Sequence, residues 1–259
     1  MTNGANDVLD VTIDGTVARL TITRPDKRNA VSDTLMDALG AFFANPPEDV
    51  RIVILSGEGE HFSAGLDLSE HVARDAAQTM RHSRNWHRIM DMIQFGGLPV
   101  ISVLKGAVIG GGLELAAATH IRIADPSTFY QLPEGRRGIF VGGGASVRIG
   151  KILGADRMIE MMLTGRKYTA EDGLRLGLSH YVCDSAAEAE AKANELAAKV
   201  ADNAQLSNYI MIQALARIED MAKADGLFTE SLCAALTQTS DDAQEGLNAF
   251  LEKRAPNFK

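Results

Sequence analysis

Apolar, strand-like runs alternate with helical segments along the first half of the chain, and this pattern leaves few folds open. Three runs predict buried strands, at residues 51–55, 98–104 and 121–124. Apolar side chains with helical spacing occur over 32–43 and again between 69 and 96. Because strands separated by helices pack as helix layers on sheets, we predict an α/β core.

The beginning of the chain adds a β-hairpin to this core. Residues 8–13 and 16–23 alternate apolar and polar side chains on either side of Asp14-Gly15. An Asp-Gly pair between two alternating runs is a strong hairpin signal, because the tight turn requires positive φ at its centre.

The last quarter of the chain has a different character. It is rich in Ala, Glu and Leu, shows no strand pattern, and predicts helices near 186–200, 206–223 and 229–238. We therefore divide the chain into a core over 1–200, which holds the active site, and a C-terminal helical region over 201–259. Helices with surplus apolar surface often pack against another subunit, so the second part is predicted to serve oligomerisation.

Composition limits the classes of protein to consider. The 259 residues carry a formal net charge of −8, which disfavours nucleic acid as a partner. No window approaches the roughly 18 apolar residues of a membrane span, so no membrane partner is expected. The first ten residues are polar and acidic, unlike a secretory signal. With only Cys183 and Cys233, the chain suits a reducing compartment, and we expect a cytoplasmic protein.

Neither a metal nor a resident cofactor is expected. Two cysteines are too few to build a zinc site from thiolates. The histidines show no paired metal-ligand spacing; they are His61, His71, His82, His87, His120 and His180.

A run of three glycines is the strongest functional signal. Gly110 to Gly112 follow the apolar run at 98–104 and open a predicted helix, where each glycine costs about 0.5–1 kcal/mol relative to alanine. Bare backbone at a helix N-terminus can hold a phosphate or the negative oxygen of a thioester enolate. Glu114 follows in an otherwise apolar helix, where it could cap the helix start or take part in catalysis.

A second isolated glutamate stands twenty residues later. Glu134 follows the strand-like run 128–131 and precedes another glycine cluster, Gly142 to Gly144. Alone, it would be an ordinary loop carboxylate. Burial and a neighbouring like charge both raise a carboxyl pKa, so one glutamate of a pair can hold a proton while the other accepts one.

A third segment, residues 61–68, follows the predicted strand at 51–55. Its small residues allow a ligand to approach the backbone closely, and Gly65 permits unusual dihedral angles. A tight turn from strand to helix would explain the same residues. Within the segment, Asp67 suits a loop-fixing role better than a catalytic one.

Taken in order, these segments resemble the crotonase (enoyl-CoA hydratase/isomerase) family, and within it the enoyl-CoA hydratases. The resemblance covers nearly the whole chain and includes Arg-Pro-Asp-Lys-Arg-Asn-Ala at 24–30, Gly-Gly-Gly-Leu-Glu at 110–114, Leu-Pro-Glu at 132–134 and Asn-Ala-Phe-Leu-Glu-Lys-Arg at 248–254. It implies a spiral of ββα turns with a helical C-terminal region, assembled as a homotrimer or as a homohexamer of two trimers. It also implies an acyl-CoA substrate, as in fatty acid metabolism.

The same resemblance implies roles for particular residues. Glu114 and Glu134 match the catalytic glutamates of the hydratases, and the N–H groups of Ala64 and Gly111 would form the oxyanion hole. The remaining substrate contacts would come from Lys27 and Arg28 beside the CoA nucleotide, from Gly65, Leu66, Asp67, Leu68 and Gly110, and from Phe250 and Lys253 of a neighbouring subunit.

Some residues depart from the family pattern. Gln131 stands where many relatives have glycine, His120 where many have aspartate, and the segment 135–144 lacks the usual proline near Val141. These positions lie close to Glu134 in the sequence. They bear on the acyl group rather than on the thioester chemistry.

We predict an enoyl-CoA hydratase, a hydro-lyase. Adding water across a double bond needs two groups that transfer protons, whereas an isomerase can work with one. Three alternatives stay open, since one fold supports several reactions. They are a specialised hydratase or hydrolase for a β-substituted acryloyl-CoA (methylthioacryloyl- or hydroxycinnamoyl-CoA), an enoyl-CoA isomerase, and a non-catalytic protein that binds CoA esters.

Overall fold

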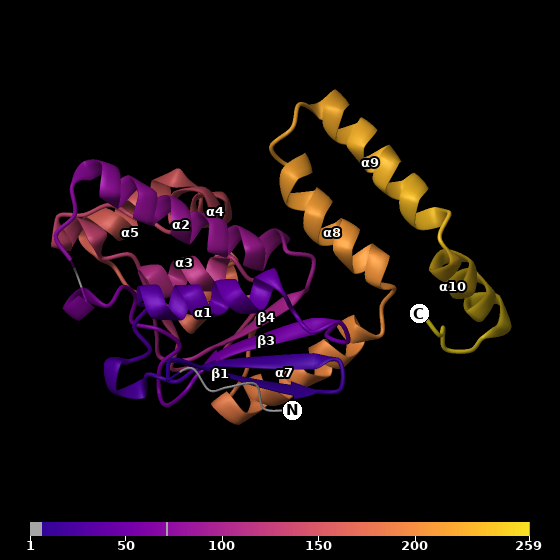
Figure 1. Cartoon of the computed structure of the whole chain (residues 1–259), viewed down its shortest axis with the longest axis horizontal. Helices are drawn as coiled ribbons and strands as arrows, with labels where there is room; N and C mark the ends of the chain where they lie inside the picture. The colour runs from indigo at the N-terminus through magenta and orange to yellow at the C-terminus, as the bar shows by residue number, and fades with distance from the viewer. Residues whose placement is uncertain (1–6, 71, 259) are drawn as a thin grey trace.

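Two β-sheets and the helices packed on them form the core of the computed structural model (Figure 1). The structure describes residues 7–70 and 72–258, so His71 and most of the segment tested for a secretory signal lie outside the described residues. The larger sheet has the order β1-β2-β3-β4-β6-β9. Its strands are β1 Leu9–Asp14, β2 Val17–Ile22, β3 Ile52–Gly57, β4 Val100–Leu104, β6 Ile121–Ala124 and β9 Tyr181–Val182.

The first two strands form the predicted hairpin. β1 and β2 pair antiparallel, and the turn between them contains Gly15 at φ 57°. Every later neighbour in this sheet is parallel. The strands predicted at 51–55, 98–104 and 121–124 are confirmed as β3, β4 and β6.

The smaller sheet shows why the chain winds as a spiral. It has the order β5-β7-β8, formed by β5 Ala107–Ile109, β7 Phe129–Gln131 and β8 Tyr168–Thr169. Successive turns place one strand in each sheet before a helix: β4, β5 and then α3 (Gly111–Ala117), followed by β6, β7 and then α4 (Ala145–Leu153). The predicted spiral of ββα turns is therefore confirmed.

Local capping explains where several helices begin. In α1 (Asp33–Ala44) the Ser32 hydroxyl accepts from the N–H of Leu35. Capping boxes start α2 (Ala76–Phe95), through Asp75 and Gln78, and α6 (Ala170–Leu176), through Thr169 and Asp172. The helix α5 (Ala155–Thr164), which the sequence pattern did not predict, follows α4.

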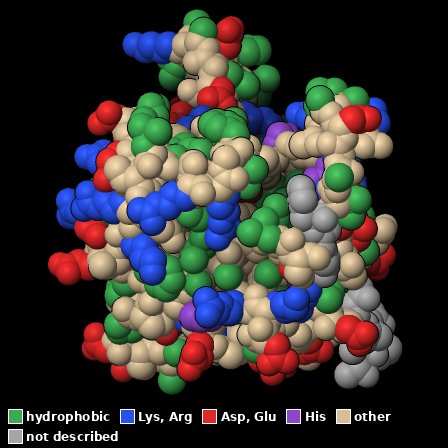
Figure 2. All heavy atoms as spheres, turned by 90° about the vertical axis from the view of Figure 1, so that its left-hand side faces the viewer, with side chains coloured by type: hydrophobic (Ala, Val, Ile, Leu, Met, Phe, Trp, Pro, Cys, Tyr) green, Lys and Arg blue, Asp and Glu red, His purple; other side chains and the backbone are tan. Residues whose placement is uncertain are grey.

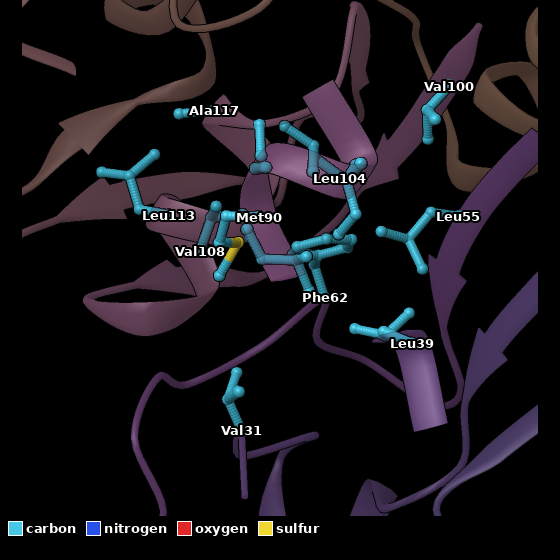
Figure 3. Packing of buried hydrophobic residues seen from close by; sticks show 14 of the residues in the cluster. Val31, Leu39, Leu55, Phe62, Met90, Val100, Leu104, Val108, Leu113 and Ala117 are labelled. Atoms are coloured by element: carbon cyan, nitrogen blue, oxygen red, sulfur yellow. The ribbon is translucent and has the colours of Figure 1, made fainter. Parts of the chain in front are cut away.

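Apolar side chains fill both sides of the large sheet. On one side, α1, α2 and α3 pack over a buried cluster in which Phe62, Met90 and Val108 converge from a loop, a helix and a strand (Figure 3). On the other side lies α7 (Ala186–Ala201), whose small side chains allow it to approach β3, β4 and β6 closely. Those facing the sheet are Ala189, Ala193, Ala197 and Ala201.

The remaining helices extend away from the core (Figure 1). α8 (Gln205–Ile218) contacts α2, α9 (Lys223–Gln238) lies along α8, and α10 (Asp241–Glu252) meets α9. The helix predicted at 206–223 is wrong in its end, because the chain breaks at 219–222, and α9 begins earlier than the predicted 229. The predicted division of the chain after residue 200 falls at the end of α7. That the helices after it serve oligomerisation stays a prediction. Within the described parts of the chain, no helix is long and apolar enough to cross a bilayer.

Candidate active site

The Gly110–Gly112 run is the start of a short buried helix that carries Glu114. Gly110 precedes α3 with φ 48° and ψ −121°, which suits glycine. A β-carbon on Gly112 would meet Ser63 at 2.6 Å, so the helix start also needs glycine to pack against the 61–68 loop. The side chain of Glu114 is only 4% exposed.

A glycine-rich loop, Gly142–Gly144, holds the Glu114 carboxylate. The Oε1 atom accepts from the N–H of Gly143 at 2.8 Å and from that of Ala145 at 3.1 Å. Burial raises the pKa of Glu114, while these two N–H groups and the charges of His87 and Arg148 act to lower it. Hydrogen bonds donated to a carboxylate favour its ionised form.

Glu134 lies in a less polar setting. It begins the 3₁₀ helix η3 (Glu134–Arg137), is buried, and its Oε2 atom has no hydrogen-bond partner within the described structure. Burial, with a contribution from the negative charge of Glu114, raises its pKa to about 7. A carboxyl group in such a site holds a proton near neutral pH.

The two glutamates line one cavity of about 130 Å³. Gly111 and Leu66 form part of its wall, together with Trp86 from α2. The rest of the wall is formed by Thr79, His82 and Ser83 on α2, and by Ile139, Phe140, Val141, Gly142 and Gly143 after η3.

The backbone donors beside the glutamates differ in part from the predicted ones. The N–H of Ala64 is unsuitable for the oxyanion hole, because it donates to the carbonyl of Arg28 at 2.9 Å. The N–H of Gly111 is at the first position of α3, where a helix offers no acceptor. Leu66 lies opposite Val31 in an isolated parallel bridge, and the hydrogen bonds of this bridge involve the neighbours of Leu66. The N–H of Val31 donates to the carbonyl of Gly65, and the N–H of Asp67 donates to the carbonyl of Val31. Within residues 7–70 and 72–258, no acceptor is found for the N–H of Leu66 or of Gly111.

Leu66 therefore replaces Ala64 as the second candidate donor. Its nitrogen lies 3.5 Å from the position that a β-carbon on Gly111 would occupy, so the two N–H groups are neighbours. Gly65, at φ 90°, allows this approach, since a β-carbon there would lie 2.6 Å from the carbonyl oxygen of Ile109. The motif alone did not distinguish Ala64 from Leu66, because only the pairing with Arg28 separates them.

The loop at 24–30 lies against this segment. Asp67 accepts from Ser69 and forms a 2.7 Å ion pair with Arg24, and these contacts hold its pKa at about 2. Asp67 is thus a buried loop-fixing residue, in keeping with the first expectation for it. Lys27 reaches Ser69 at 2.9 Å, and both Lys27 and Arg28 are exposed. Leu68 is also exposed, at the edge of the loop.

The face on the left of Figure 1 turns toward the viewer in Figure 2. Lys and Arg side chains gather there around a hollow where hydrophobic side chains are exposed. This local positive charge contrasts with the net charge of −8 and suits an anionic ligand.

Phe250 and Lys253 do not line the cavity that contains Glu114 and Glu134. They lie at the end of α10, and Phe250 is 80% exposed.

The two single residues that depart from the family pattern, Gln131 and His120, have structural contacts. The side-chain amide of Gln131 donates to the carbonyl of Gly165 at 2.5 Å. Its backbone carbonyl accepts from the N–H of Gly110, so Gln131 links β7 to the start of α3. His120 is held by Val100 and Gln94, and burial lowers its pKa. In the segment 135–144, which also departs from the family pattern, Arg136 donates to the carbonyl of Thr164.

The sequence reading missed a polar stripe on α2. Thr79, His82 and Ser83 share one helical face with Trp86, at spacings of three, four and seven residues, and all four line the cavity. The helical spacing between 69 and 96 already predicts a helix, so this shared face could have been found from the sequence. Met90, four residues after Trp86 on α2, is fully buried in the core cluster and does not line the cavity.

Known proteins are similar to this chain in both sequence and fold. A family model described as "Enoyl-CoA hydratase/isomerase" matches residues 12–259. The 2,3-dehydroadipyl-CoA hydratase of Escherichia coli is 32% identical over 94% of this chain and 95% of its own. The crystal structure of a "putative enoyl-CoA hydratase" from Rhodopseudomonas palustris has a TM-score of 0.92 at 48% identity, covering 95% of each chain. The enoyl-CoA hydratase of Bacillus anthracis gives a TM-score of 0.91 at 30% identity, over 97% of this chain and 99% of that one.

The family match spans nearly the whole chain, and it includes every element that lines the cavity. The order of the motifs, the spiral of two sheets and the paired glutamates agree with it. This protein belongs to the enoyl-CoA hydratase/isomerase (crotonase) family.

Proposed function

We propose that this protein is an enoyl-CoA hydratase, which adds water across the α,β double bond of an enoyl-CoA thioester. One observation carries the proposal: two buried glutamates line a single small cavity together with Leu66 and Gly111, whose N–H groups have no acceptor among the described residues. An isomerase that moves a proton between carbons needs one such carboxyl group, whereas hydration uses two.

The surroundings of the two glutamates suit different roles. Glu114 receives two N–H hydrogen bonds, which favour the carboxylate that orients and activates water. No described residue donates to Oε2 of Glu134, and the pKa of Glu134 is about 7, which suits a group that gives up a proton. The pairing of one charged and one neutral carboxyl group is a familiar solution to acid–base catalysis at neutral pH.

The reaction then proceeds with balanced atoms. The N–H groups of Leu66 and Gly111 hold the thioester oxygen, which makes the β-carbon electrophilic and stabilises the negative charge of the enolate. The water oxygen bonds to the β-carbon, and one water proton passes to the Glu114 carboxylate. The proton of Glu134 is delivered to the α-carbon, so that one water molecule has been added. Proton exchange with solvent restores both carboxyl groups.

The wall of the cavity favours one second candidate. Thr79, His82 and Ser83 on α2 give one side of the wall a polar character, and Ile139 and Phe140 after η3 give another side an apolar one. A substituent that is partly polar, as in hydroxycinnamoyl-CoA, suits both sides. The specialised hydratase or hydrolase for a β-substituted acryloyl-CoA is therefore the second candidate. The name of the E. coli relative adds 2,3-dehydroadipyl-CoA to the esters worth testing.

A panel of thioesters tests the proposal. Crotonyl-CoA, a longer enoyl-CoA, 2,3-dehydroadipyl-CoA, methylthioacryloyl-CoA and hydroxycinnamoyl-CoA are each incubated with the protein in H₂¹⁸O, and the products are identified by mass spectrometry. A hydratase yields a 3-hydroxyacyl-CoA with one ¹⁸O. Free CoA with a cleaved acyl product indicates the specialised enzyme, a shifted double bond without ¹⁸O indicates an isomerase, and no turnover of any ester would leave only CoA-ester binding.

The proposal extends to assembly and location. We propose a homotrimer or a hexamer, in which α10 reaches a neighbour's CoA, because Phe250 and Lys253 lie away from the cavity of their own chain and are exposed. The chemistry proposed here requires no cofactor besides the CoA of the substrate. The sparse use of cysteine, at Cys183 and Cys233, suits the cytoplasm.

A further inference from the structure

The loop that holds Glu114 is fixed by hydrogen bonds rather than by side-chain packing. Gly142–Gly144 has no side chains, and Gly144 takes φ 110°. A β-carbon on Gly143 would meet Glu114 Oε2 at 2.7 Å, so the backbone must come this close to the carboxylate. Behind the loop lies a second cavity of about 580 Å³, lined by Gly144, His87 and Arg148 among others. With open space behind it and no packed side chain, the loop depends on polar contacts for its position.

Two side chains hold its carbonyl groups. Ser83 on α2 donates to the carbonyl oxygen of Gly142 at 2.6 Å. Arg148 on α4 donates through Nη1 to the carbonyl oxygen of Gly143 at 3.2 Å. With its carbonyls turned outward to these donors, the loop directs the N–H groups of Gly143 and Ala145 toward Glu114.

The guanidinium of Arg148 is itself held in place. Its Nη2 pairs with Asp91 at 2.6 Å, its Nε donates to Gln94 at 2.6 Å, and the side chain is only 9% exposed. Both partners lie on α2. A buried guanidinium with all three nitrogens engaged loses little further entropy in acting as a fixed donor.

We infer that Arg148 is a positioning residue for the proposed reaction: it holds the Gly142–Gly144 loop, whose backbone in turn holds the carboxyl group of Glu114 in place. This inference rests on the proposed function, because it assigns Arg148 to the step in which Glu114 accepts a proton. Arg148 touches neither the substrate cavity nor the reacting atoms, and it acts through the loop and through its charge.

Charge and geometry act in the same direction. The charged and titratable groups that act on Glu114 are His87 from α2, Arg148 from α4 and Glu134 from η3. Burial raises the pKa of Glu114, and the positive charges of His87 and Arg148 oppose that rise. Removal of the Arg148 charge should therefore shift the ionisation of Glu114 to higher pH, and removal of its hydrogen bond should loosen the carboxylate.

Three substitutions separate the two effects. Arg148→Met removes both the charge and the donors, Arg148→Gln keeps a donor without the charge, and Arg148→Lys keeps the charge without the planar fork. Turnover of crotonyl-CoA, or of the best ester in the panel, is measured against pH for each folded variant. In the plot of kcat/KM against pH, we expect the acidic limb to move to higher pH for Arg148→Met and Arg148→Gln. For Arg148→Lys it should stay where it is in the wild type. At the wild-type optimum, kcat should fall by about 10–100-fold for Met, the usual cost of misplacing a catalytic group, with KM little changed.

Arg84→Met is the matched control. Arg84 lies on α2, is exposed and lines the same rear cavity, so its loss removes an equal charge without releasing the loop. Its acidic limb should coincide with that of the wild type. An unmoved limb in Arg148→Met and Arg148→Gln would overturn the inference and leave Arg148 as a brace between α2 and α4.

A second measurement is independent of turnover. Titration of the ¹³C carboxyl signal of Glu114, assigned by its loss in Glu114→Gln, should show a higher pKa in Arg148→Met than in the wild type. If the wild type turns over no ester, the proposed function fails, yet this titration still tests the effect of Arg148 on Glu114. Equal titration curves in the two proteins would reject it.

Discussion

The α/β core and the C-terminal helices bury their apolar residues to very different degrees. In the core, β3 and β4 are buried at every position, and α3 likewise. In α8, α9 and α10 only Asn208, Gly226 and Ala249 are buried. The exposed apolar side chains of these three helices include Leu215, Leu227, Phe228, Leu232, Leu236, Leu247, Phe250 and Leu251.

The difference separates two tasks. The core buries a contiguous apolar cluster, and it contains both glutamates and both proposed backbone donors. The C-terminal helices present an apolar surface far larger than isolated exposed residues would give, which is typical of a face that another chain covers. Chemistry is thus assigned to the core, and assembly with CoA contact to the helices. The predictions below test this assignment.

The largest effect is expected from the two glutamates. Replacing either Glu114 or Glu134 with glutamine removes a proton-transfer group while keeping its shape, and kcat should fall by roughly 10²–10⁴. Affinity for a CoA ester, measured by calorimetry, should change little, because recognition is assigned elsewhere. If both variants kept near-wild-type rates on the best ester, the core would not carry the chemistry in the way proposed.

The raised pKa of Glu134 predicts that the free energy of unfolding depends on pH. Between pH 4.5, the ordinary carboxyl value, and about 7, the unfolded chain ionises while folded Glu134 keeps its proton. The folded state therefore binds more protons than the unfolded chain, and stability falls as pH rises through this window. Glu134→Gln, which cannot ionise, should be more stable than the wild type by up to about 3 kcal/mol above pH 7 and by nothing below 4.5.

Urea unfolding of the two proteins at pH 4.5 and pH 8.5 provides the measurement. Because every other titrating group is common to both proteins, the difference between the two curves isolates Glu134. A stability difference that is the same at both pH values would contradict the raised pKa.

The proposed oxyanion donors predict a loss of about 10²-fold in kcat for Gly111→Pro, as the removal of one such donor typically causes. The first position of a helix tolerates proline, so the variant removes the N–H without breaking α3. Gly111→Ala is the control, since it keeps the N–H and adds a β-carbon 3.3 Å from Trp86. A Pro variant that is folded by circular dichroism and fully active would exclude this donor.

The smallest effect is expected from the C-terminal helices. Lys253→Glu should weaken CoA-ester binding several-fold, and more at low salt than at high salt, because an exposed charge contact is screened. Turnover of bound ester should be unchanged. Light scattering at micromolar concentration should give the mass of a trimer or hexamer, and a stable, fully active monomer would rule out a CoA site shared between subunits.

Much of the fold could be predicted because its signals are local. The Asp-Gly turn, the apolar run of β3 and the Ser32 cap each depend on a few neighbouring residues. The end of α8 was mispredicted, since residues 219–222 contain neither proline nor glycine to mark the break. That break, and the short strands β5, β8 and β9, depend on tertiary contacts more than on propensity.

The sequence by itself determined which residues are available for the chemistry: two isolated glutamates, each with a glycine-rich run close by, in the order typical of the family. The tertiary structure decided what each one can do. The Glu114 carboxylate is held by N–H groups 29 and 31 residues away, whereas no described residue donates to Oε2 of Glu134. The same holds for the proposed oxyanion donors: the N–H of Ala64 donates to the carbonyl of Arg28, whereas the N–H of Leu66 has no acceptor in the described part of the chain. Hydrogen-bond partners and burial depend on segments distant in the chain, which no local pattern specifies.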